Sequence, residues 1–231
     1  MQAEVTNRVW GAYFSIVSTL LLFLSIVAFS DNLFTDVGQP SNSDAKFIIH
    51  GLFGLAWYVL LVTQANLARV RNLRLHKKIG IATFVVAIGV TLTTLYIFIV
   101  VWKGWGNMTA EVRANRLFLP AYALCLVMAW LRRGQPAWHK RLVFTGTFFM
   151  LEPVLARAYD PLVVSWAKPL LSALYTEQVD EIAFQTFLWG TWLGLFLSLA
   201  AYDFKTQQRV HIVTIAGLSW FGLTWLISAY T

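Results

Sequence analysis

Residues 50–80, HGLFGLAWYVLLVTQANLARVRNLRLHKKIG, contain the pattern that decides the fold. An apolar run follows His50 and ends in a turn with five basic residues and no acid. A second histidine, His76, then opens another apolar run. Because about 20 apolar residues cross the hydrocarbon core of a membrane as one helix, this segment predicts two transmembrane helices joined by a basic loop.

The rest of the chain has the same character. Of its 231 residues, 58% are hydrophobic and 13% are charged, and the mean hydropathy is +0.62. A soluble domain averages about 45–50% apolar and about 25% charged residues. The chain is therefore expected to be an all-α integral membrane protein, with residues 1–231 forming one transmembrane domain. Seven stretches are long enough to span the membrane: 9–29, 46–68, 79–102, 117–131, 142–159, 182–202 and 211–230.

The basic residues predict an orientation. Twelve of them fall at the N-terminus and in the loops after the second, fourth and sixth spans, and six fall on the other side. Since short cytoplasmic loops carry an excess of Lys and Arg, we expect the N-terminus in the cytoplasm and the C-terminus outside. This asymmetry accounts for the net charge of +7, so no nucleic acid partner is implied.

A histidine motif recurs at the start of every second span. It reads LHKKI at 75–79, WHKRL at 138–142 and, in weaker form, RVHI at 209–212. An aromatic residue precedes each histidine by 17 or 19 positions: Trp57, Tyr122 and Trp192. The pattern predicts three related helical hairpins added to a first helix, and repeats in membrane proteins often place a site at their interface.

The motif places three histidines, His76, His139 and His211, at one depth, the cytoplasmic boundary. Asp203 lies eight residues before His211 and is expected there too. Three imidazoles and a carboxylate suit a divalent metal such as zinc or iron, with one position open for water or substrate. The alternative is that these histidines bind lipid phosphate at the membrane surface, and the adjacent lysines disfavour a bound cation.

A second group of ionisable residues is expected deeper, toward the outside. It contains Glu152, Arg157 and His50, with Gln185 at a similar depth. Ionisable residues within spans are costly and usually face the bundle interior in pairs. Pro153 removes a backbone hydrogen bond and predicts a kink that opens a polar cavity. We interpret Glu152, Arg157 and His50 as catalytic or substrate-binding residues, and a buried structural network is the alternative.

The combination of His50, Trp57 and Gln64 with LHKKIG, HKRL and the later Asp203 and RVH resembles a group of bacterial polytopic membrane proteins. The likeness covers most of the chain and implies a multi-pass location in the inner (plasma) membrane, but it supplies no activity. The pattern is also similar in its logic to the seven-helix membrane hydrolases of the adiponectin-receptor and alkaline-ceramidase type. Those proteins share the orientation and a cytoplasmic-side three-histidine zinc site, whereas their His-x-x-x-His pair on the last span is absent here.

Three functions are consistent with the sequence. The first is a membrane metalloprotein that acts on a lipid-like or quinone-like substrate, with membrane lipids as neighbours. The second is a b-type haem protein for electron transfer, whose axial histidines lie at the inner boundary. The third is a non-catalytic subunit or anchor that binds a membrane protein partner or a second copy of the chain.

Overall fold

The computed structural model describes residues 2–35, 38, 40–171 and 174–231, and every regular element in these ranges is a helix. The prediction of an all-helical chain is therefore confirmed. Six helices are long and apolar enough to cross a membrane, which is compatible with a multi-pass membrane protein. They are α1 (Gln2–Ala28), α2 (Ala45–Arg69), α3 (Leu73–Val100), α4 (Ala110–Leu131), α8 (Glu177–Gln207) and α9 (Ile212–Tyr230).

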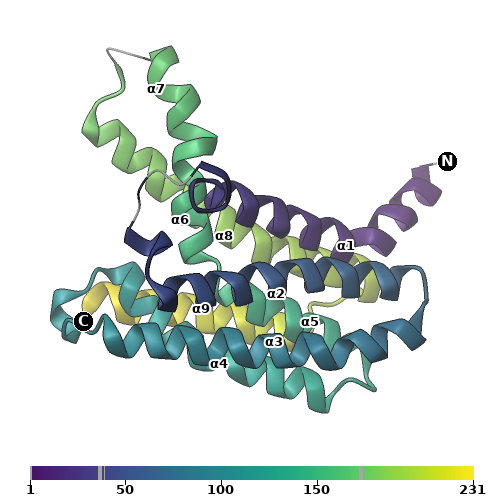
Figure 1. Ribbon diagram of the computed structural model, residues 1–231. Helices are drawn as coiled ribbons and strands as arrows, with labels where there is room; N and C mark the ends of the chain where they lie inside the picture. The colour runs from purple at the N-terminus through teal and green to yellow at the C-terminus, as the bar shows by residue number, and fades with distance from the viewer. Residues whose placement is uncertain (1, 36–37, 39, 172–173) are drawn as a thin grey trace.

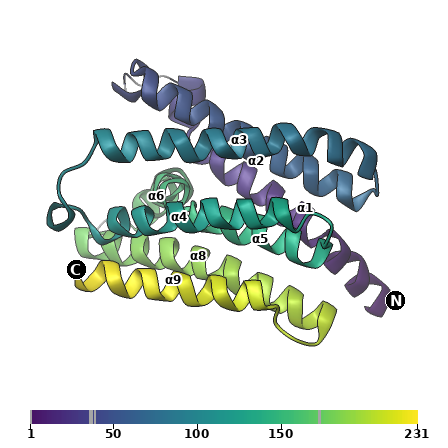
Figure 2. The ribbon, with the colours of Figure 1, turned by 90° about the horizontal axis from the view of Figure 1, so that it is seen from below.

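The predicted span over residues 142–159 is not one continuous helix. It is divided between α5 (Pro136–Phe149) and α6 (Glu152–Tyr159), with Met150 and Leu151 between them. Figure 2 shows α6 end-on beside the lengthwise α4 and α5, so the chain turns sharply at this break. Pro153 lies in the first turn of α6, where a missing N–H is tolerated. The kink expected near Pro153 is thus a complete helix break slightly earlier in the chain.

Successive helices pair as antiparallel hairpins. The helices α2 and α3 pack along each other, as do α4 and α5 (Figure 2). The turn between α2 and α3 uses Arg71 in the left-handed region at φ 59°. Asn72 then caps α3, because its side chain accepts a hydrogen bond from the N–H of Leu75 at 3.2 Å. Local turn chemistry therefore explains the sharp reversal of the first hairpin.

Shorter elements connect the long helices. They are η1 (Asp31–Thr35), η2 (Pro40–Asn42), η3 (Trp105–Asn107), η4 (Asp160–Val164) and α7 (Ser165–Leu171). Figure 1 shows that α6 leads away from the bundle toward α7, and that the chain returns through α8. No residue of α7 is buried. The segment that contains α7 therefore projects from the bundle.

The core is aromatic where α4, α5, α8 and α9 meet. The ring of Phe118 lies 5.3 Å from those of Phe149 and Trp192 and 5.9 Å from that of Phe221, measured between ring centres. The indole N–H of Trp192 donates to the carbonyl of Phe148 at 2.5 Å. Trp192 thereby both fills space and satisfies its polar atom, as buried tryptophans usually do.

The packing of α9 against α5 can be tested at Gly217. A Cβ added there would lie 2.6 Å from the Cγ2 of Thr145 and 3.3 Å from the ring of Phe196, whereas one at Gly222 of the same helix meets nothing within 4 Å. Gly217→Ala is expected to destabilise the protein by about 1–3 kcal/mol through overpacking. Thermal unfolding in detergent measures this. Equal effects of Gly217→Ala and the control Gly222→Ala would contradict the packing.

Candidate functional site

The turns after α2, α4 and α8 lie at one end of the bundle, together with the N-terminus (Figure 2). We call this end, which carries the three histidine motifs, the basic end. The C-terminus lies at the opposite end. The three histidines of the repeat are therefore at a common end of the bundle, and the question is which of them share a site.

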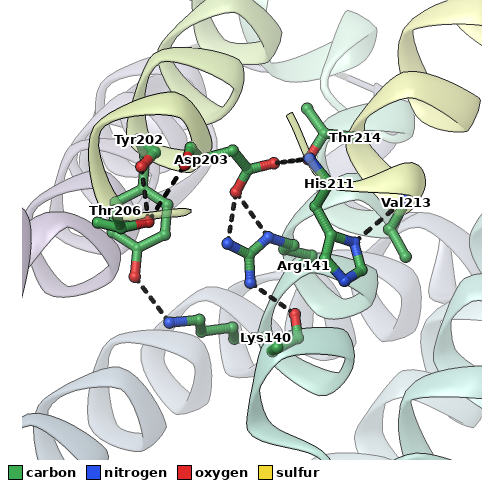
Figure 3. Close-up of polar contacts among 9 residues, drawn as sticks. Lys140, Arg141, Tyr202, Asp203, Thr206, His211, Val213 and Thr214 are labelled. Carbon is green, nitrogen blue, oxygen red and sulfur yellow. Dashed lines mark hydrogen bonds and ion pairs between the residues drawn. The ribbon is translucent and has the colours of Figure 1, made fainter. Parts of the chain in front are cut away.

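A buried ion pair connects two helices at the basic end (Figure 3). Arg141 of α5 and Asp203 of α8 both have side chains that are 0% exposed. The Nε and Nη2 atoms of Arg141 both lie 2.6 Å from Oδ1 of Asp203. Nη1 of Arg141 donates to the carbonyl of Ala137 at 2.7 Å. The guanidinium is thus fixed against its own helix and against α8.

The second carboxylate oxygen of Asp203 reaches α9. Oδ2 accepts a hydrogen bond from the backbone N–H of His211 at 3.0 Å and another from the hydroxyl of Thr214 at 2.5 Å. A carboxylate has about four acceptor positions, and these two contacts together with the two from Arg141 occupy them. We therefore assign Asp203 to a polar network that joins α5, α8 and α9. Sequence reasoning missed Arg141 and Thr214 as its partners.

Lysine and aromatic side chains surround this pair. Lys140 donates to the hydroxyl of Tyr202 at 2.7 Å, and its ammonium lies 5.0 Å from the ring centres of both Tyr202 and Phe14. Tyr202 also stacks on Tyr13 of α1 at 4.7 Å. The two cations that follow His139 in the sequence are therefore engaged by Asp203 and by aromatic rings.

His211 begins α9. Its Nδ1 accepts a hydrogen bond from the N–H of Val213 at 3.2 Å, which makes it the N-cap of the helix. Its ring lies edge-on to Trp138, with 5.1 Å between the ring centres. Burial, and then the nearby charge of Arg141, lowers the pKa of His211 below its usual range. His211 is thus placed as a neutral helix cap.

His76 and His139 form a pair. Their ring centres are 6.2 Å apart and their planes are at 85°. The Nδ1 of His76 bonds to the carbonyl of Gln64 at 3.2 Å, and that of His139 bonds to the carbonyl of Ala129 at 2.9 Å. Each bond runs from the second helix of a hairpin to the first. The two hairpins therefore fix their histidines by the same kind of hydrogen bond.

This anchoring determines the protonation of the neutral rings. A carbonyl oxygen can only accept, so each Nδ1 carries the proton and each Nε2 keeps a lone pair. Neither Nε2 has a hydrogen-bond partner among the residues that the structure describes. No group of three or more His, Cys, Asp or Glu side chains in those residues is placed to hold a metal ion. The imidazole pair is thus the part of the predicted metal set that the fold brings together.

Two members of the predicted outer group have hydrogen-bond partners on other helices. Glu152 accepts a hydrogen bond from the side-chain amide of Asn115 at 2.6 Å. His50 bonds through Nδ1 to the hydroxyl of Thr93 at 3.0 Å. Asn115, a polar residue in the first half of α4, is the sequence signal that could have identified the partner of Glu152.

The remaining members of that group have local partners. Arg157 donates to the carbonyl of Pro153 at 3.3 Å and lies over the ring of Phe29, 5.1 Å from its centre. Gln185 bonds to Glu181 and Trp189 of its own helix at 2.9 and 2.7 Å. No hydrogen bond between any two of Glu152, Arg157 and His50 occurs in the described structure, although the charge of Arg157 acts on both other residues, so their grouping as one site stays a prediction.

Comparisons with protein-family models, with curated proteins and with solved structures found no match to this chain. The site is therefore interpreted from its own geometry.

The role of the ion pair can be tested by Asp203→Asn, which removes the charge and keeps the shape. An unpaired buried Arg141 should then cost about 3–5 kcal/mol of stability. The double change of Arg141→Met and Asp203→Leu should recover much of this loss, because it leaves no buried charge. Thermal unfolding in detergent measures both, with Asp160→Asn at an exposed acid as the control. A stable Asp203→Asn protein would contradict the assignment.

The cap at His211 predicts a pH dependence. Because the pKa of His211 is lower in the folded protein, the unfolded chain binds the proton more readily. The stability that neutral His211 gives to the folded protein is therefore complete above pH about 6.5 and is lost as the pH falls below that value. His211→Ser keeps an N-cap that does not titrate. The variant should lose less stability than the parent between about pH 7 and pH 5. Identical pH profiles of thermal unfolding would argue against the neutral cap.

Proposed function

We propose that the chain is a seven-span inner-membrane protein whose basic end faces the cytoplasm and holds a metal centre between His76 and His139. The orientation follows from the twelve basic residues on that side against six on the other. The positions of the N-terminus and C-terminus at opposite ends of the bundle support an odd number of crossings (Figure 2). In this proposal the six long helices are six of the spans, and the broken segment of α5 and α6 is the seventh.

The spacing of the two imidazoles is the observation that carries the metal centre. A metal ion lies about 2 Å from each coordinating nitrogen, so His76 and His139 could both reach one ion placed between their rings. The observed separation of 6.2 Å fits this arrangement. Metal-bound histidines characteristically donate their other N–H to a carbonyl or carboxylate, and both rings here do so.

The number of ligands favours haem iron over zinc. Structural zinc sites use four protein ligands and catalytic ones use three, whereas His76 and His139 could together hold a haem iron. Bound haem supplies one-electron transfer. Exposed cations next to the pair, among them Arg74, Lys77 and Lys78, suit the two carboxylates of a haem. His76 and His139 would thus hold the iron of a b-type haem for electron transfer, and the exposed cations would neutralise its carboxylates.

The cations beside His139 do not oppose this assignment. Arg141 is neutralised by Asp203, and Lys140 is held by Tyr202. Lys77 and Lys78 are exposed to solvent, where water and salt screen their charge. The objection that adjacent lysines repel a bound cation therefore has little weight in the folded protein.

The proposal is tested by an absorption spectrum and a metal analysis of the detergent-purified chain, with and without added haemin. One haem per chain should give a Soret band that His76→Ala and His139→Ala each abolish or shift. His211→Ala and His50→Ala are matched controls and should keep it. Retained helical circular dichroism shows that each variant is folded.

Two outcomes would overturn the haem assignment. The first is zinc at one ion per chain, lost in the same two variants, which would replace haem by a non-haem metal centre of the kind that acts on a lipid-like or quinone-like substrate. The second is absence of both haem and metal after haemin and metal addition, which would contradict the centre altogether and favour a non-catalytic membrane subunit.

A further inference from the structure

A groove between α3 and α4 has no role in the proposed metal centre. It has a volume of about 620 Å³, and apolar side chains such as Leu95, Ile99, Leu119 and Ala123 line it. Its single charged lining residue is Arg116, six positions after the start of α4. Since α4 begins at the end opposite the basic end (Figure 2), Arg116 lies toward that opposite face of the membrane.

Arg116 is fixed by aromatic rings instead of by an acid. The centre of its guanidinium lies 4.6 Å from the ring centre of Phe98 and 5.3 Å from that of Trp102. Its Nη2 donates to the carbonyl of Phe98 at 3.3 Å, while its buried Nε has no hydrogen-bond partner. Within the described residues Arg116 makes no ion pair with an acidic side chain. The groove therefore presents a positioned cation that lacks an anion.

The groove around Arg116 indicates which kind of anion could bind there. A charge within a membrane span is costly and is normally paired, and arginine matches the planar, bidentate geometry of phosphate oxygens. From Arg116 to Ala123 the groove extends two helical turns, about 10 Å, toward the middle of the membrane. Because the groove is apolar and runs from Arg116 toward the middle of the membrane, it suits the hydrocarbon chain of a lipid.

We propose that the groove binds one anionic phospholipid, with its phosphate at Arg116 and one acyl chain along α3 and α4. Trp102 at the mouth is suited to this position, because tryptophan favours the headgroup level of a membrane. Arg116 is about 9 Å from the start of α4, a depth that a phosphate at the boundary and a flexible arginine side chain reach together. This binding site is independent of the centre at His76 and His139.

The test uses the full chain in neutral detergent, titrated with dioleoyl-phosphatidylglycerol or with dioleoyl-phosphatidylcholine. Native mass spectrometry counts bound lipid, and thermal unfolding reports its effect on stability. One phosphatidylglycerol should bind per chain in preference to phosphatidylcholine and should raise the unfolding temperature. Arg116→Gln should weaken this binding about fivefold. Lys103→Gln removes an exposed charge at the same end and should leave it unchanged.

A second variant tests the acyl chain separately. Ala123→Trp fills the deep part of the groove and leaves Arg116 in place, so it should weaken dioleoyl-phosphatidylglycerol and leave binding of a short-chain phosphatidylglycerol unaltered. Three results would overturn the proposal: equal binding of the two headgroups, equal losses in Arg116→Gln and Lys103→Gln, or full competition by inorganic phosphate alone. Because none of these variants touches the histidine pair, failure here is distinguishable from failure of the metal centre.

Discussion

The fold depends most directly on the buried ion pair between Arg141 and Asp203. Three helices meet at this one carboxylate, because Asp203 of α8 accepts hydrogen bonds from Arg141 of α5 and from the start of α9. A charge in a low-dielectric interior is tolerated only when it is paired and fully hydrogen-bonded. Both conditions are met here, so separation of α5 from α8 would leave two unpaired charges in an apolar environment, and separation of α9 would remove two hydrogen bonds from the carboxylate.

This constraint also positions the histidine pair. His139 is two residues before Arg141 on α5, so fixing the guanidinium fixes the start of that helix. The facing ring, His76, is fixed by the turn of the first hairpin and by the carbonyl of Gln64. Two rigid hairpins thus bring two imidazoles to a separation of 6.2 Å with their Nε2 lone pairs unused. His139 and Arg141 lie on the same turn of α5, so the residue that stabilises the basic end also orients the proposed ligand His139.

Much of this arrangement was predictable from sequence, because apolar length and basic turns are local properties. The six long helices follow from such patterns. The division of residues 142–159 was only partly predictable. Pro153 signals a kink, but the composition of the segment is that of a span. The partner of Asp203 was not predicted, because it lies 62 residues away. Depth alone places Asp203 with the histidines, whereas in the structure it pairs with Arg141, a residue of opposite charge at the same depth. The same limit applies to Glu152 and Asn115, which are 37 residues apart.

The central claim is that His76 and His139 bind one iron from opposite hairpins. Electron paramagnetic resonance of the ferric, haem-loaded protein tests it most directly, because the spin state of the iron reports how many strong axial ligands it has. The account predicts a low-spin signal in the parent chain that becomes high-spin when either His76 or His139 is replaced by alanine. A high-spin signal in the parent chain, or a low-spin signal that survives both replacements, would contradict it.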